Sequence, residues 1–155
     1  MKSDKKPVDI SKRRKRMENL SLAGLILLCV GLVVPFANIG SETLQTVFKY
    51  VYAAGALIYT FARMVNVNAP GDSMRLKRLR RMEMWAGITF LVGAFFWFYN
   101  SARFPNVGFS LVVMRDTIMF TLAGAIIQVI ASWMIAARMN KEAKEASGAD
   151  KDKKR

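Results

Sequence analysis

The chain has no histidine and a single cysteine, Cys29, among its 155 residues. It therefore lacks the commonest metal ligand and the side chain that most often carries protons at neutral pH. It also lacks clusters of Cys, Asp or Glu spaced for metal binding, and glycine-rich phosphate loops, so we expect no metal and no cofactor. Cys29 stands in an apolar stretch without an ionisable neighbour, and we interpret it as a packing residue. Because no nucleophile stands beside a base, we do not expect an enzyme.

Acidic residues are also scarce: 11 Asp and Glu stand against 24 Lys and Arg, for a net charge of +13. The charges fall in blocks, and the apolar residues, 53% of the chain, fall in long runs between them. This arrangement is typical of a chain that crosses a bilayer. A basic chain also suits nucleic-acid binding, but a DNA-binding domain needs no apolar segments of membrane length. We therefore expect anionic lipid head groups, and not nucleic acid, to face the positive charge.

Four apolar segments are long enough to cross a membrane as helices. The sequence thus predicts an all-α, integral membrane protein, an up-down four-helix bundle. We place the helices at about residues 20–37, 44–65, 84–100 and 111–138, within a transmembrane domain of residues 20–139. Around it we place a basic leader at 1–19, a basic hub at 66–83 and a charged, flexible tail at 140–155.

The basic residues lie almost entirely on one side of this predicted threading. Eight lie in the leader, six lie between Arg63 and Arg81, and seven lie from Arg138 onward, which leaves Lys49, Arg103 and Arg115. The positive-inside rule then predicts that both termini and the hub face the cytoplasm. We expect the membrane to be the bacterial cytoplasmic (inner) membrane.

Two basic clusters are candidate contact sites for lipid head groups or for a partner. The leader cluster consists of Lys12, Arg13, Arg14, Lys15 and Arg16, and the hub cluster consists of Arg75, Lys77, Arg78, Arg80 and Arg81. Apolar residues recur every third position in the hub, so one side of a helix there can lie on lipid or protein while the arginines face water and phosphate. We predict that the hub continues into the third segment as one helix from Met74 to Asn100, about 40 Å long at about 1.5 Å per residue.

The two halves of the chain resemble each other at four points, in the same order. Arg16-Met17-Glu18 matches Arg81-Met82-Glu83, Ala23-Gly24 matches Ala86-Gly87, Ala54-Gly55-Ala56 matches Ala123-Gly124-Ala125, and Ala62-Arg63-Met64 matches Ala137-Arg138-Met139. The matches predict two tandem helical hairpins that arose by duplication, with parallel copies related by an axis along the membrane normal. The alternative is coincidence, because apolar sequence of low complexity produces such matches by chance.

Four polar residues inside the predicted helices form a candidate intramembrane polar site: Lys49, Arg115, Asp116 and Gln128. An ionisable group at membrane depth is a functional candidate by default. We predict that Asp116, near the outer interface, forms a structural ion pair with Lys49, and the alternative is a role linked to a proton or cation. The fourth segment also carries a stripe that we predict to face the bundle or a sister subunit: Thr121, Ala125, Gln128, Ser132 and Ala136. Two roles are open for the polar residues of the stripe. Gln128 holds packed helices together through a hydrogen bond, or Gln128, Thr121 and Ser132 line a polar pathway.

Small residues are predicted to bring the helices together, since apolar surface alone drives little association in lipid. They are Gly24, Gly31, Ala53, Ala54, Gly55, Ala56, Ala86, Gly87, Gly93 and Ala94. We expect these residues to lie where helices approach one another closely.

Together these features predict a non-enzymatic accessory or interaction subunit, whose basic cytoplasmic face contacts anionic lipid or a partner. We expect a homo-oligomer or a membrane-protein partner. The alternative is a small oligomeric transporter or channel, with Asp116, Lys49 and Gln128 lining the path. A polar cavity that reaches the middle of the membrane would favour transport, whereas a dry and fully packed bundle would favour the accessory role.

Overall fold

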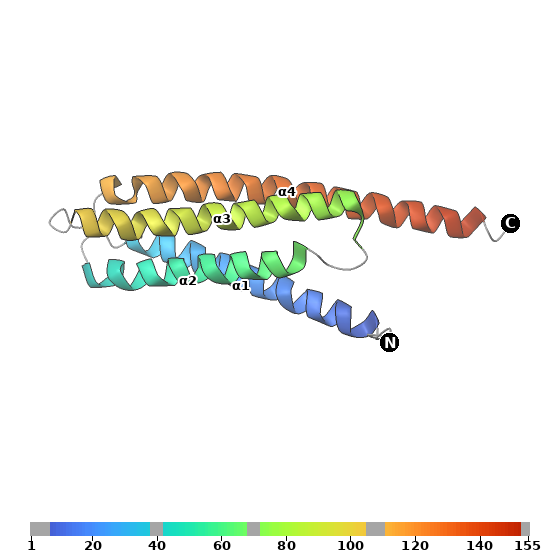
Figure 1. Cartoon of the computed structure of the whole chain (residues 1–155), viewed down its shortest axis with the longest axis horizontal. Helices are drawn as coiled ribbons and strands as arrows, with labels where there is room; N and C mark the ends of the chain where they lie inside the picture. The colour runs from blue at the N-terminus through green and yellow to red at the C-terminus, as the bar shows by residue number, and fades with distance from the viewer. Residues whose placement is uncertain (1–6, 38–41, 68–71, 105–110, 153–155) are drawn as a thin grey trace.

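Four long helices make up nearly all of the described chain. The computed structural model describes residues 7–37, 42–67, 72–104 and 111–152. The helices are α1 (Pro7–Ala37), α2 (Glu42–Val67), α3 (Met74–Arg103) and α4 (Leu111–Asp152), and the described residues contain no strand. Each helix runs antiparallel to the one before it, so the start of α1 and the end of α4 lie at the same end of the molecule, here called the terminal end (Figure 1). The predicted all-α class is confirmed.

The helices are longer than the predicted membrane segments because the flanking charged residues are helical as well. α1 begins inside the leader at Pro7, a residue well tolerated in the first turn because the N–H group that proline lacks would have no partner within the helix at that position. α4 continues through the tail to Asp152. α3 begins at Met74, directly after Ser73, whose hydroxyl oxygen accepts a hydrogen bond from the Leu76 amide at 3.3 Å. The prediction that the later part of the hub and the third segment form one helix is confirmed.

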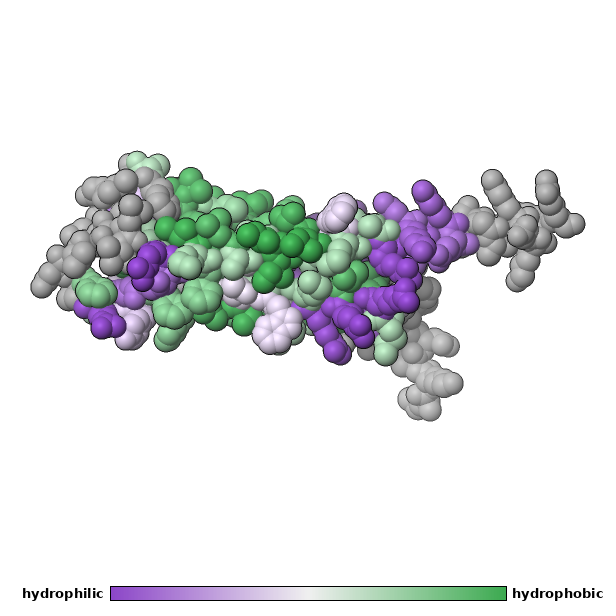
Figure 2. All heavy atoms as spheres, turned by 90° about the horizontal axis from the view of Figure 1, so that it is seen from above, coloured by the Kyte–Doolittle hydropathy of each residue, from purple (hydrophilic) through white to green (hydrophobic). Residues whose placement is uncertain are grey.

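Three of the helices, within the described residues, are long and apolar enough to cross a membrane. The spans are Lys12–Pro35 in α1, Met74–Arg103 in α3 and Val113–Glu145 in α4. The second predicted segment, residues 44–65, lies in α2 and is not among these spans; the 26 residues of α2 include Lys49 and Arg63 as well as amide and hydroxyl side chains. Figure 2 shows apolar residues gathered in a central belt on one face, with hydrophilic residues at both ends of the belt. These are the features of a membrane protein.

The helices pack in chain order, with α1 on α2, α2 on α3 and α3 on α4. Among the described residues α1 and α4 do not pack against each other, and α1 slopes away from α4 toward the terminal end (Figure 1). At the terminal end, Lys12–Arg16 in α1 and the residues after Arg138 in α4 are mostly charged and offer each other no apolar face. The described part of the bundle is therefore open on the side between α1 and α4.

Small residues set the close approach of neighbouring helices, as predicted. A Cβ atom on Gly24 would lie 2.7 Å from the Tyr59 amide nitrogen, and one on Gly55 would lie 2.8 Å from the Gly24 carbonyl oxygen. α1 and α2 thus meet backbone to backbone. Between α3 and α4, a Cβ atom on Gly124 would come within 2.7 Å of the Phe90 ring. Such close approach strengthens van der Waals contact, which is the main attraction between helices in lipid.

Aromatic side chains fill the core of the bundle. Tyr52 packs on Trp97 with ring centroids 5.6 Å apart, and Tyr59 packs edge-on against Phe90 at 5.4 Å. All four rings are buried, together with Leu28, Ala56, Ala94 and Met114. Trp97 lies near the end of α3 and Met114 near the start of α4, so this packed core extends from Tyr59 and Phe90, near the middle of the bundle, toward the end opposite the terminal end.

Candidate functional site

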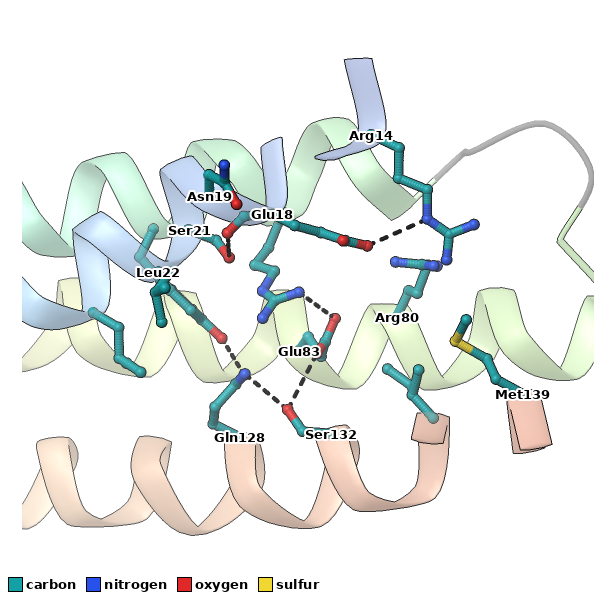
Figure 3. A pocket seen from close by; sticks show the side chains of 14 residues that line it. Arg14, Glu18, Asn19, Ser21, Leu22, Arg80, Glu83, Gln128, Ser132 and Met139 are labelled. Atoms are coloured by element: carbon teal, nitrogen blue, oxygen red, sulfur yellow. Dashed lines mark hydrogen bonds and ion pairs between the residues drawn. The ribbon is translucent and has the colours of Figure 1, made fainter. Parts of the chain in front are cut away.

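A pocket of about 450 Å³ lies between α1 and α4, in the half of the bundle nearer the terminal end. We call it the α1–α4 cleft. All four helices contribute to it, and Figure 3 shows Glu18 of α1, Glu83 of α3 and Ser132 of α4 around it. Its polar lining consists of Arg14, Glu18, Asn19, Ser21, Tyr59, Arg63, Arg80, Glu83, Gln128 and Ser132, and its apolar lining consists of Leu22, Leu25, Ile135 and Met139.

Glu83 is the buried carboxylate of the cleft, with its side chain 4% exposed. Its Oε2 accepts a hydrogen bond from Arg63 Nη1 of α2 at 2.9 Å, and its Oε1 accepts one from the Ser132 hydroxyl of α4 at 3.4 Å. Ser132 accepts a hydrogen bond from the Gln128 amide at 3.0 Å, and the Gln128 oxygen accepts one from the Tyr59 hydroxyl. A continuous chain of hydrogen bonds thus joins α2, α3 and α4 around one carboxylate.

A second ionic group lies nearer the terminal end and is organised by Asp72, just before α3. The Asp72 carboxylate accepts a hydrogen bond from Arg80 Nε at 2.6 Å and one from Arg14 Nη1 at 3.5 Å. Arg14 also pairs with Glu18, one turn along α1, at 3.3 Å. The Asp72 and Arg80 side chains are almost completely buried, so their ion pair is shielded from water. These pairs tie α1 to the start of α3 while α1 stays apart from α4.

The charges in and beside the cleft balance one another. Each of the three acids has an arginine within 3.5 Å: Glu18 has Arg14, Asp72 has Arg80 and Arg14, and Glu83 has Arg63. A balanced set of ion pairs offers no excess charge to a bound ion, and a buried pair is stable only while both partners are present. Within the part of the chain that the structure describes, the cleft ends at the level of Tyr59 and Gln128, beyond which the aromatic core is packed.

The four residues predicted to form one intramembrane polar site do not come together. Gln128 lies in the α1–α4 cleft, whereas Lys49, Arg115 and Asp116 lie toward the opposite end of the bundle. The Lys49 ammonium lies over the Phe98 ring, 4.8 Å from its centroid. An ammonium in this position is attracted by the electrons of the ring face, so Lys49 is stabilised without a carboxylate.

Asp116 has other partners as well. Its Oδ2 accepts a hydrogen bond from Asn100 Nδ2 at 3.1 Å, and its Oδ1 lies 3.5 Å from Arg115 Nε. The predicted ion pair between Asp116 and Lys49 is therefore wrong. The reason is local: Asn100 on the packed face of α3 donates to this carboxylate, and Arg115 is its neighbour on α4.

The polar stripe predicted on α4 turns only partly toward the bundle. Gln128 is buried and Thr121 and Ser132 are half-buried, whereas Ala125 and Ala136 are exposed. The inner face of α4 is centred instead on Thr117, Gly124 and Ala131, which are all buried. The Thr121 hydroxyl lies 2.6 Å from the Tyr52 hydroxyl, within hydrogen-bonding distance. The polar members of the stripe therefore link helices to one another, as the packing alternative for Gln128 predicted.

The basic clusters divide into exposed and buried members. Arg80 is 3% exposed, so the prediction that it faces lipid or a partner is wrong. It lies three residues before Glu83 and four after the buried Leu76, which places it on the inner face of α3. Arg14 turns toward Asp72 in the same way. Lys77 is half-buried. The other members of the two clusters are exposed: Lys12, Arg13, Lys15, Arg16, Arg75, Arg78 and Arg81.

The sequence pattern does not single out the charged residues of the cleft, but it contains a signal for Glu83. Buried residues of α3 recur at spacings of three and four through Arg80, Glu83, Gly87, Phe90 and Ala94. The face of small residues predicted in the third segment, continued toward the start of the helix, therefore passes through Glu83. Treating the basic hub and the apolar segment as separate units hides this continuity. Asp72 carries no periodic signal, because it lies outside the helices.

Comparison of the chain with protein-family models, with curated proteins and with solved structures finds no match.

Proposed function

We propose that this chain crosses the bacterial cytoplasmic membrane four times, with both termini in the cytoplasm. The leader, the hub and the tail hold most of the lysines and arginines, and their described parts lie at the terminal end. This asymmetry supports a cytoplasmic location for that end. α1 and α3 are apolar enough to span, and both run away from the terminal end. Because α2 leads from the far end of α1 back to the start of α3, it has to cross the membrane as well.

The protein acts as a non-enzymatic accessory subunit that binds a partner membrane protein at the α1–α4 cleft. The observation that carries this proposal is the open side of the bundle, where polar groups stand among apolar neighbours. Asn19 is exposed beside Leu20 and Leu22 on α1, and Ser132 is half-buried beside the exposed Trp133 on α4. Polar groups that face lipid are unfavourable, and a helix that brings hydrogen-bonding side chains of its own satisfies them.

Site-specific photo-crosslinking in living cells tests this proposal. The crosslinking amino acid replaces Leu22, which is 58% exposed at the cleft, or Leu57, which is 60% exposed on α2 and does not line the cleft. We expect a discrete cross-linked protein from position 22 and none from position 57. A product of twice the mass of the chain would identify the partner as a second copy. Protein products of equal yield from both positions, or from neither, would contradict the proposal.

A small oligomeric transporter or channel is the second candidate function, and the buried Glu83 favours it. A carboxylate that a pocket reaches from one side of the membrane can take up a proton or a cation. Two observations weigh against this candidate: Arg63 neutralises Glu83, and the cleft ends at Tyr59. Purified protein in sealed vesicles should therefore show no proton or cation flux above that of empty vesicles. A flux that Glu83→Gln abolishes would establish transport in place of the accessory role.

An origin by duplication is supported by the contacts of matched residues. In the first half, Gly24 meets Gly55, and a Cβ atom on Gly24 would lie 3.0 Å from the Gly55 carbonyl oxygen. In the second half, a Cβ atom on Gly124, which matches Gly55, would lie 3.2 Å from the carbonyl oxygen of Ala86. Ala86 stands next to Gly87, the match of Gly24. An experimental structure in which α1 and α2 superpose on α3 and α4 in this register would establish the duplication.

A further inference from the structure

A second pocket, a groove of about 430 Å³, lies between α3 and α4 and shares no lining residue with the α1–α4 cleft. Four basic side chains line it, Arg75 and Arg78 from α3 and Arg138 and Lys141 from α4. Apolar side chains, among them Leu79 and Met134, complete the lining. Each helix thus contributes two cations three residues apart, a spacing that puts both on one face of a helix.

The groove has more positive than negative charge. Arg75 and Arg78 are exposed and make no ion pair with any described residue. Arg138 pairs with Glu142 at 3.1 Å, and Glu142 also accepts a hydrogen bond from the Ser73 hydroxyl at 2.9 Å, which holds this carboxylate between the two helices. Lys141 lies 4.0 Å from Glu145, and both side chains are more than 60% exposed. Such an exposed pair is weak, so the groove can still attract an anion.

The groove lies where charged residues give way to apolar ones. Along α4, exposed apolar side chains lead toward it: Ile126, Ile130 and Trp133. Trp133 is 75% exposed and directly precedes Met134 of the groove. Tryptophan is enriched at membrane–water interfaces, where its ring lies at the level of the head groups. In the proposed orientation we therefore expect the four cations at the height of the head groups, with the apolar surface of α4 continuing from them toward the hydrocarbon layer.

We propose that this groove binds the phosphate group of an anionic phospholipid of the cytoplasmic leaflet, whose acyl chains lie along α4. The planar guanidinium groups of Arg75 and Arg78 present paired N–H donors that match phosphate oxygens. The apolar lining and the exposed surface of α4 favour a lipid over a free phosphate, which has no acyl chains to bury. Basic pockets between membrane helices on the cytoplasmic side bind such head groups. This inference rests on the orientation given under the proposed function.

The test measures lipid binding to the full-length purified protein by native mass spectrometry. The lipids are phosphatidylglycerol and phosphatidylcholine with the same acyl chains. The variant Arg75→Gln/Arg78→Gln should bind phosphatidylglycerol about 10- to 30-fold more weakly, because it removes two guanidinium groups that would donate charged hydrogen bonds to the phosphate. The matched control Arg13→Gln/Arg16→Gln removes the same net charge from two exposed residues of the leader that do not line the groove, and it should change the affinity less than about twofold. Arg75→Lys/Arg78→Lys keeps the charge but not the fork of donors, and it should lose part of the affinity while retaining the fold.

Three outcomes would overturn the lipid site. The first is an equal loss of affinity in the groove variant and the leader control, which would show general attraction between opposite charges. The second is equal binding of phosphatidylcholine, and the third is full displacement of the lipid by an equimolar amount of inorganic phosphate. None of these results affects crosslinking from Leu22, so the lipid site and the accessory role fail independently. A hub found outside the cytoplasm would remove the lipid site of the cytoplasmic leaflet.

Discussion

Tyr59 of α2 donates a hydrogen bond to Gln128 of α4, although α2 and α4 do not pack directly against each other. The same relationship recurs seven residues earlier on both helices, where the Tyr52 and Thr121 hydroxyls lie 2.6 Å apart. α2 and α4 run in the same direction (Figure 1), so a step of two helical turns brings the next pair of residues into register. Two tyrosines therefore bridge helices that are held apart by α3.

The first prediction concerns this bridge. Tyr59→Phe removes the donor and leaves the Gln128 oxygen without its tyrosine partner, so it should lower the free energy of unfolding by about 1 kcal/mol, in the range measured for hydrogen bonds between membrane helices. Thermal unfolding of the protein in mild detergent measures the change. Tyr50→Phe is the control, because Tyr50 is 60% exposed. This variant should unfold at the wild-type temperature. Equal effects of the two substitutions would show that the bond to Gln128 contributes nothing.

The buried ion pair gives the second prediction. Glu83→Ala leaves Arg63 without its carboxylate and should cost about 3–5 kcal/mol of stability. The double variant Arg63→Met/Glu83→Leu removes both charges, and apolar side chains of similar size should recover most of that loss. Unfolding in detergent again gives the measurement, with Glu145→Ala as the control for an exposed pair. A double variant no more stable than Glu83→Ala would mean that the charges themselves are required.

The third prediction concerns the contact between α1 and α2. Gly24→Ala places a methyl group where the Tyr59 backbone nitrogen would lie 2.7 Å away, and this position cannot relax by a side-chain rotation. The helices have to separate, at a cost of about 1–3 kcal/mol. Ala23→Val, at the exposed neighbouring position, should be tolerated. The yield of monodisperse protein and its unfolding temperature would distinguish the two variants, and a stable Gly24→Ala protein would rule out the close approach.

The fourth prediction follows from the separation of Lys49 and Asp116. Because each has a different partner, Lys49→Asp and Asp116→Lys should each destabilise the protein, and the double swap should equal the sum of the two. Effects at sites without shared partners add. Unfolding of the three variants supplies the comparison, and rescue by the double swap would restore the ion pair that the sequence predicted.

The fifth prediction tests the orientation in the membrane. In a chain with Cys29→Ala, a cysteine replaces either Phe104, exposed after α3, or Ala143, exposed on α4 at the terminal end. A thiol reagent that does not cross membranes should label intact cells at position 104 and label position 143 only after the cells are opened. The reverse pattern would place the termini outside the cytoplasm.

The helices could be predicted because a span in lipid needs a long apolar run. The positions of close helix contact could be predicted because only small residues let two helices approach so closely. The hub and the third segment were correctly joined through Met74, since no residue between them stops a helix. The polar site could not be predicted in the same way. From charge alone, Arg80 was predicted at the surface and Asp116 was paired with Lys49. In the structure Arg80 bonds Asp72 and Asp116 bonds Asn100, and both contacts depend on how α3 is rotated about its axis.

The open side of the bundle also lay outside what the sequence could predict. Whether α1 closes on α4 depends on the balance between apolar contact near Leu22 and charge at the ends of both helices, and no local pattern reports that balance. The burial of Glu83 could have been predicted from the sequence, because the buried face of α3 continues through this residue at helical spacing. Helical periodicity has to be followed across the boundary between charged and apolar sequence.

α4 does not stop at the groove but continues as a helix from Arg138 to Asp152. This extension rises about 20 Å along its axis at about 1.5 Å per residue. In the proposed orientation it is a spacer that stands off from the bilayer surface. A protein bound near Asp152 would be presented to the cytosol at a set height above the lipid head groups, and shortening α4 by whole turns would lower it in equal steps.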